Sequence, residues 1–143
     1  MIYENILYHN VEELSKTPLG YKLYRYPQSV CGSLNSRARW MARYCCGCEL
    51  RFVTESDIVN INLYAESGSD YALAVIFCGD YVHNVVKLNC PGMNTITLSK
   101  PNFAEPECFY ENNGFDKNVW RVHFHNCEVT ICSVDAMNCE IRP

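Results

Sequence analysis

The stretch Asp57-Ile58-Val59-Asn60-Ile61-Asn62-Leu63-Tyr64-Ala65 decides the fold class of this chain, because its apolar and polar side chains largely alternate. Successive side chains of a strand point to opposite faces of a sheet, so this alternation predicts a strand with one buried face. The polar residues Glu66 to Asp70 follow as an expected loop, and the apolar run Tyr71 to Phe77 predicts a strand buried on both faces. Similar patterns recur along the chain at spacings of about 8–12 residues, which is typical of all-β sandwiches and barrels. We therefore expect residues 1–143 to form a single all-β domain, an antiparallel, jelly-roll-like β-sandwich.

Two short segments near the N-terminus favour helix instead. Ile6 to Leu14 has apolar residues at a spacing compatible with a short helix, with Asn10 in position to cap it. Ser29 to Leu34 has room for one helical turn. Arg39 to Tyr44, in contrast, resembles a short strand, and Pro101 to Gly114 is expected to be irregular. The sandwich should thus carry one or two short helical turns near its N-terminus.

Composition and charge exclude several classes of protein. The chain has 143 residues, of which 48% are hydrophobic and 20% charged, as in ordinary globular domains. Its formal net charge of −4 argues against nucleic-acid binding, which requires clustered Lys and Arg. No apolar run approaches the ~20 residues of a membrane span, so we expect no membrane partner. A local excess of arginine is expected on a solvated sheet face: Arg37, Arg39, Arg43 and Arg51.

The cysteine content bears on the cellular compartment. The sequence contains ten cysteines, enough for a disulfide framework in a small secreted protein. However, the first residues, Met1 to Asn5, lack the basic and apolar regions of a signal peptide. Because reducing compartments keep thiols free, we expect reduced cysteines and a cytoplasmic protein.

Metal binding has only weak support in the sequence. Cys45-Cys46-Gly47-Cys48 contains the CxxC spacing that can chelate zinc, but a closed structural site needs a second such pair. His123 and His125 lie two residues apart on an expected strand and so share a face. The weak candidate ligands are thus Cys45, Cys48, His123 and His125, and we expect neither a bound metal nor a cofactor.

Asp80, His83 and Trp40 are the candidate ligand-binding residues. Asp80-Tyr81-Val82-His83 has the acid-to-histidine spacing of one class of serine esterases, but the chain has no Gly-x-Ser-x-Gly nucleophile elbow. We therefore expect no catalytic residue in this chain. Trp40 has the aromatic face that stacks on sugar rings, whereas Trp120 should face the core together with Val122 and Phe124.

Four stretches, read together in their order and spacing, resemble the N-terminal β-sandwich region of bacterial two-domain SGNH/GDSL-type hydrolases. They cover most of the chain: Tyr21 to Pro27, Arg37 to Thr54, Phe77 to His83, and Phe115 to Arg121 with the closing Ile141-Arg142-Pro143. In that family a jelly-roll-like domain precedes an α/β esterase domain. The sequence departs from the family pattern in its many cysteines.

The resemblance implies a function but no catalytic residue. It implies a non-catalytic ancillary domain, the N-terminal part of a longer esterase, whose partner is the SGNH-type catalytic domain in cis. It further implies that the domain helps to bind or position an acylated carbohydrate. Two alternatives stay open: a free-standing carbohydrate-binding module and, more weakly, a zinc- or thiol-containing structural protein. A contiguous strip of exposed aromatic residues would favour sugar binding, whereas a broad apolar patch would favour docking.

Overall fold

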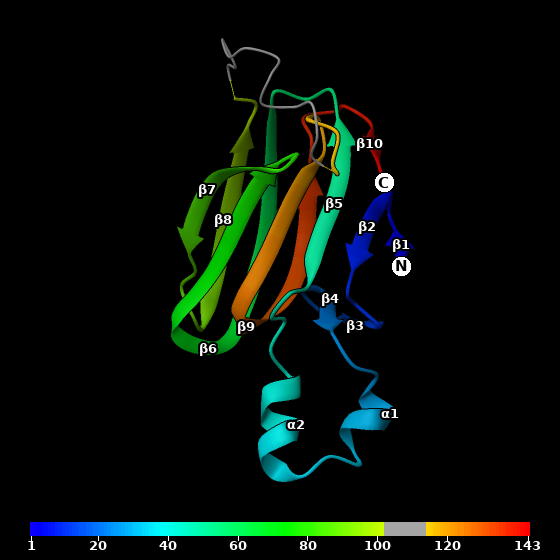
Figure 1. Ribbon diagram of the computed structural model, residues 1–143, viewed down its shortest axis with the longest axis vertical. Coiled ribbons are helices and arrows are strands. Elements are labelled where there is room, and N and C mark those ends of the chain that lie inside the picture. Colours follow the sequence, from blue (N-terminus) through cyan, green and yellow to red (C-terminus); the bar gives the residue numbers. More distant parts are fainter. Residues whose placement is uncertain (102–113) are drawn as a thin grey trace.

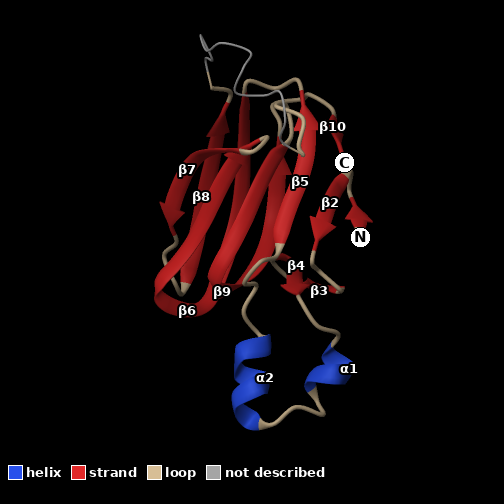
Figure 2. Cartoon of the chain, in the orientation of Figure 1, coloured by secondary structure: helices blue, strands red, loops and turns tan. Residues whose placement is uncertain are grey.

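The computed structural model describes residues 1–101 and 114–143, and antiparallel strands dominate it (Figures 1 and 2). The expected all-β class with few helices is confirmed. The irregular structure expected over 101–114 falls largely on residues outside the described part. The described strands are β1 (Ile2–Tyr3), β2 (Ile6–His9), β3 (Glu13–Thr17), β4 (Gly20–Tyr24), β5 (Glu49–Thr54), β6 (Ile58–Cys78), β7 (Tyr81–Lys87), β8 (Gly92–Ser99), β9 (Trp120–Asp135) and β10 (Ile141–Arg142). The described helices are α1 (Gln28–Cys31) and α2 (Ser36–Ala42).

Two long strands, β6 and β9, organise the sheet. They pair with each other on both sides of a shared corner, with Ala65 opposite Val129 before it and Leu73 opposite His125 after it. The first part of β6 also pairs with β8, and the second part pairs with β7. The first part of β9 pairs with β5, which continues the sheet to β2, β1 and β10, and the second part pairs with β4 and then β3. The curled sheet thus has two halves that share their longest strands.

The corner explains why one strand replaces the two strands and the loop expected over residues 57–77. The polar segment Glu66 to Asp70 remains extended, and the register of β6 against β9 shifts there. Asn126, opposite in β9, takes the left-handed conformation with φ 57°. A Cβ on Gly68 would lie only 2.7 Å from the carbonyl oxygen of Asn126, so this close approach of two backbones requires glycine. The separate loop was therefore a wrong prediction: its polar residues mark a bend within a strand.

The core lies between the two halves of the curled sheet. Val59, Ile61 and Leu63 alternate inward from the first part of β6, as the sequence pattern predicted. Trp120 and Phe124 from β9 are also fully buried, which confirms the core face predicted for that strand. These residues belong to one continuous core cluster, and burying each such side chain contributes about 1.5–3 kcal/mol to folding.

The helix predicted for residues 6–14 is wrong, because the segment forms β2 and the start of β3. Glu4 and Asn5, both with positive φ, make the turn between β1 and β2. Asn10 also takes the left-handed conformation, with φ 56°, and thus breaks the chain between two strands instead of capping a helix.

The strand predicted for residues 39–44 is also wrong, because α2 covers most of it. The side chain of Asn35 caps this helix by accepting a hydrogen bond of 2.9 Å from the Ala38 amide, an interaction worth about 1 kcal/mol. The helical turn expected at 29–34 is confirmed in α1. Both helices project from one end of the sheet (Figure 2). Within the two helices, Ala42 alone is buried. No helix in residues 1–101 and 114–143 is long and apolar enough to cross a membrane.

Candidate functional site

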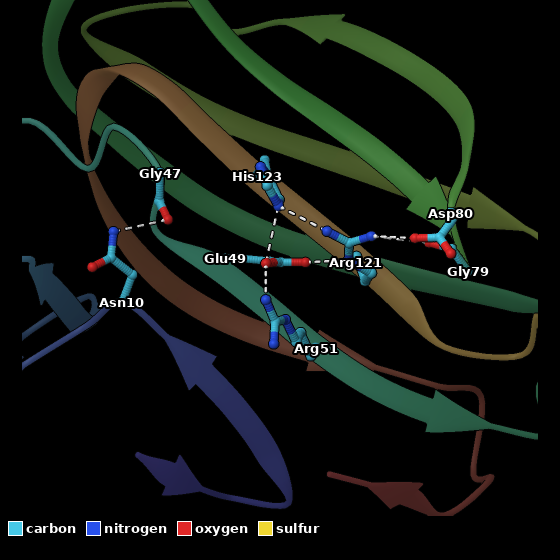
Figure 3. Close-up of polar contacts among 8 residues, drawn as sticks. All are labelled: Asn10, Gly47, Glu49, Arg51, Gly79, Asp80, Arg121 and His123. Carbon is cyan, nitrogen blue, oxygen red and sulfur yellow. Dashed lines mark hydrogen bonds and ion pairs between the residues drawn. The ribbon is translucent and has the colours of Figure 1, made fainter. Parts of the chain in front are cut away.

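A buried carboxylate, Glu49, is the centre of a charged cluster on the outer face of the sheet. Because Leu50 and Phe52 of β5 point into the core, Glu49 and Arg51 point outward. Pairing of β5 with β9 sets Glu49 opposite His123 and Arg51 opposite Arg121. Strand register alone therefore brings one acidic and three basic or potentially basic side chains together (Figure 3).

Glu49 is held by three side chains, although it is only 1% exposed. Nη2 of Arg51 donates to its Oε2 at 2.7 Å, and Nε of Arg121 donates to its Oε1. Nε2 of His123 lies 3.0 Å from Oε2 (Figure 3). Burial alone would raise the pKa of Glu49, but these three partners outweigh it and hold the pKa well below the usual range. Glu49 is thus a fixed anion, unsuited to accept a proton in catalysis.

Aromatic rings cover the cluster and reduce its contact with water. The ring of Phe115 lies 3.8 Å from Cζ of Arg121 and 4.8 Å from Cζ of Arg51. Phe77 lies on Arg121 as well, at 5.0 Å. Stacked guanidinium groups paired with a buried carboxylate hold strands together in a low-dielectric environment. The arrangement therefore links β5, β6 and β9, and its charges satisfy one another.

Asp80 and His83, the candidate ligand residues, have different partners. Asp80 extends the Glu49 cluster, since its Oδ1 lies 3.3 Å from Nη1 of Arg121 and its Oδ2 accepts from the Phe115 amide at 3.3 Å. His83 lies on β7, where its ring makes an edge contact with Trp120 at 5.5 Å between centroids. Asp80 thus orients Arg121, and His83 packs on a core residue.

Trp40 does not join Asp80 and His83, because it belongs to α2, at the end of the molecule opposite the β6–β7 turn (Figure 1). Its side chain is exposed, and its ring contacts Tyr44 edge to face at 5.0 Å between centroids.

The weak metal candidates lie in two separate places. Cys45 and Cys48 are both buried: Sγ of Cys45 donates to the Leu23 carbonyl, and Sγ of Cys48 to the Asn10 carbonyl. The proximity of the Cys48 thiol, together with burial, raises the pKa of Cys45, and the proximity of Cys45 lowers that of Cys48.

His123 and His125, the other two metal candidates, lie apart from the cysteines. His123 is engaged by Glu49, and the ring of His125 lies 6.2 Å from that of His123. Burial lowers the pKa of His125. Within the described residues, no group of three or more His, Cys, Asp and Glu side chains is arranged to hold a metal ion.

A second buried carboxylate, Glu128, lies beside the helices. Nζ of Lys22 is 2.9 Å from its Oε2, Nη2 of Arg43 is 3.0 Å from its Oε1, and Ser67 donates to Oε1 at 2.6 Å. Burial would raise the pKa of Glu128, but these partners lower it. Lys22 also pairs with the exposed Glu66.

A cavity of about 360 Å³ opens next to Glu128. It lies between β4, the two helices and β9. Its lining residues come from all four elements, from the segment that joins the helices and from the residue that follows α2: Lys22, Tyr24, Gln28, Cys31, Gly32, Arg39, Ala42, Arg43 and Glu128.

Residues 25–44, which we call the helical tip, combine basic and exposed apolar side chains. Residues 14–48 contain six of the chain's 12 Lys and Arg and none of its 16 Asp and Glu. The arginines expected on a sheet face are mostly here instead: Arg37 and Arg39 lie in α2, and Arg43 follows it. The tip also exposes four large apolar side chains: Tyr26, Val30, Trp40 and Met41.

Sequence reasoning missed both buried carboxylates. The sequence signal for a buried carboxylate was an acidic residue directly before an apolar strand segment, as in Glu49-Leu50. The second part of the signal was the basic residues that β9 places opposite that strand. That signal needs the pairing of β5 with β9, which connects residues about 70 positions apart and cannot be read from local periodicity.

Comparisons with known proteins inform the fold. No protein-family model and no curated protein sequence matches this chain. Among solved structures, the salicylyl-acyltransferase SsfX3 from a tetracycline biosynthetic pathway is similar, with a TM-score of 0.73 and 11% sequence identity. The similarity covers 96% of this chain and 39% of that one, so the chain spans well under half the length of its structural relative. At this identity the likeness establishes a shared fold.

Proposed function

We propose that this chain is a non-catalytic ancillary domain of an SGNH/GDSL-type ester hydrolase, which packs on the catalytic domain in cis and helps to position an acylated carbohydrate. The observation that carries the proposal is the match of nearly the whole chain to 39% of an acyltransferase. Acyl transfer and ester hydrolysis share attack on an acyl carbonyl and differ in the acceptor, so one ancillary domain suits either reaction.

The charged clusters around Glu49 and Glu128 favour a structural role over a catalytic one. Both oxygens of Glu49 are occupied by basic partners, and so is the carboxylate of Glu128. Their depressed pKa values make them poor proton acceptors. His83 contacts Trp120 and is not paired with Asp80, which is bound to Arg121.

The helical tip is the surface that best suits docking. Exposed apolar side chains next to an excess of positive charge fit a partner whose surface is apolar at its centre and acidic at its rim. The acid-free segment 14–48 argues for this charge complementarity. Exposed aromatic residues, in contrast, lie in separate places: Tyr26 and Trp40 in the tip, Tyr71 in β6 and Tyr81 in β7. That distribution favours docking over a sugar platform.

We further propose a cytoplasmic location. Nine cysteines in the described residues are free thiols, four of them buried, and a reducing compartment preserves that state.

The experiment that tests the proposal is to read the open reading frame downstream of the codon for Pro143. We expect a Gly-x-Ser nucleophile segment within ~20 codons, then an alternating β/α pattern and a late Asp-x-x-His. A stop codon directly after Pro143 would contradict an ancillary domain in cis and would favour a free-standing carbohydrate-binding module.

A further inference from the structure

The cavity beside Glu128 has an excess of positive charge. Its lining includes three cationic side chains, Lys22, Arg39 and Arg43, and one carboxylate, Glu128. Two carboxylates outside the lining also touch it, since Glu66 pairs with Lys22 and Glu13 accepts from the Gln28 amide, so the excess of positive charge belongs to the lining itself. A concave surface lined mainly by one sign of charge concentrates ions of the opposite sign.

The two arginines retain hydrogen-bond donors for a ligand. Arg39 and Arg43 are four residues apart and therefore share one face of the helix. Arg39 donates through Nε and Nη2 to the carbonyls of Cys31, Gly32 and Leu34, which fixes its position but leaves Nη1 without a partner in the described residues. Arg43 contacts Glu128 through Nη2 alone, and its side chain is 53% exposed.

The remaining polar lining is neutral. The side chains of Gln28 and Tyr24 line the cavity without a hydrogen bond to any described residue. Fixed guanidinium groups with neutral donors around them match carboxylate and phosphate oxygens, which arginine binds in bidentate fashion.

We propose that this cavity binds a small organic anion through a carboxylate or phosphate group, held by Arg39 and Arg43 with Gln28 and Tyr24 beside them. Its volume of about 360 Å³ falls at the lower end of the range of about 300–1,000 Å³ for small-molecule sites. Glu128 has a positioning role, since it holds Lys22 and Arg43 at the cavity wall. This inference goes beyond the proposed function and does not depend on a catalytic domain.

Isothermal titration calorimetry with two probes, inorganic phosphate and benzoate, tests the site. We expect at least one probe to bind one-to-one, with a Kd of about 1 mM or tighter at low salt. Arg43→Gln should weaken binding about tenfold or more, as expected for losing a charge-assisted hydrogen bond. Arg37→Gln is the matched control, because Arg37 lies on the same helix but does not line the cavity.

A second variant separates ligand binding from folding, because Arg43→Gln also removes a partner of Glu128. Gln28→Glu places a negative charge in the lining, and the Gln28 side chain has no hydrogen bond to a described residue, so binding should weaken while the melting temperature stays close to that of the wild type. The proposal is overturned if neither probe binds, if Arg37→Gln weakens binding as much as Arg43→Gln, or if Gln28→Glu leaves affinity unchanged.

Discussion

Replacing Glu49 by glutamine should destabilise this protein far more than any surface substitution. The change keeps the size of the side chain but removes a charge that three partners surround. Arg121, whose side chain is only 12% exposed, would keep Asp80 at 3.3 Å as its remaining acidic partner. Arg51, at 19% exposure, would lose the carboxylate to which it donates. The variant therefore leaves partly buried positive charges uncompensated.

The magnitude follows from the burial of the cluster. Removing one partner of a buried ion pair destabilises a protein by about 3–5 kcal/mol. For a chain of this size, each kcal/mol lowers the melting temperature by about 2–4 °C, so a loss of about 6–20 °C is expected. Urea denaturation followed by circular dichroism gives the free energy of unfolding, and calorimetry gives the melting temperature.

Glu55→Gln is the matched control for this experiment. Glu55 also pairs with an arginine, Arg142, but at 3.6 Å and with 82% of its side chain exposed. An exposed pair contributes about 0–1 kcal/mol, so this variant should be close to wild type. If Glu49→Gln and Glu55→Gln lower the free energy of unfolding equally, the reasoning about the Glu49 cluster is refuted.

Three further predictions address pH, the corner and the thiols. Folding lowers the pKa of Glu49 and Glu128, so near the ordinary carboxyl pKa only the unfolded chain binds protons at these two residues. The free energy of unfolding should therefore fall as the pH drops below ~4.5. A free energy of unfolding that is flat between pH 6 and pH 3.5 would contradict this. Gly68→Ala should destabilise by about 1–3 kcal/mol, because the added Cβ meets backbone at 2.7 Å, whereas Gly114→Ala, whose added Cβ has no described atom within 4 Å, should be neutral in the same urea titration. Equal effects would argue against the tight corner. In the native protein, a thiol reagent should modify the exposed Cys139 quickly and the buried thiols only after unfolding; rapid native labelling of every thiol would show that the packing is wrong.

The sequence predicted the fold class because alternation is a local property. Val59, Ile61 and Leu63 alternate with polar neighbours, and each lies in the core. Trp120 and Phe124 follow the same rule in β9.

The errors came from features that local patterns do not carry. Asn10 suits a helix cap and the left-handed conformation equally well, and the pairing of β2 with β5 decides between them. The polar residues Glu66 to Asp70 read as a loop, but pairing of β6 with β9 keeps them extended across the corner. Arg39 to Tyr44 has a strand-like pattern that the Asn35 cap outweighs.

The candidate site was predicted least well, because its members meet through long-range pairing. Asp80 was singled out for its spacing to His83, yet its partner is Arg121, more than forty residues away in the chain. The cavity beside Glu128 needs α2 to lie next to β4, which the strand predicted at residues 39–44 did not allow. Ligand binding by Asp80, His83 and Trp40 stays a prediction.

Hydrogen–deuterium exchange tests the docking of the helical tip most directly. The measurement compares the chain of residues 1–143 with the product of the complete reading frame. If the tip packs on a catalytic domain, amides of residues 28–44 should exchange more slowly in the longer product, while those of β7 should exchange alike in both. Equal exchange over residues 28–44, or new protection confined to β7, would contradict the account.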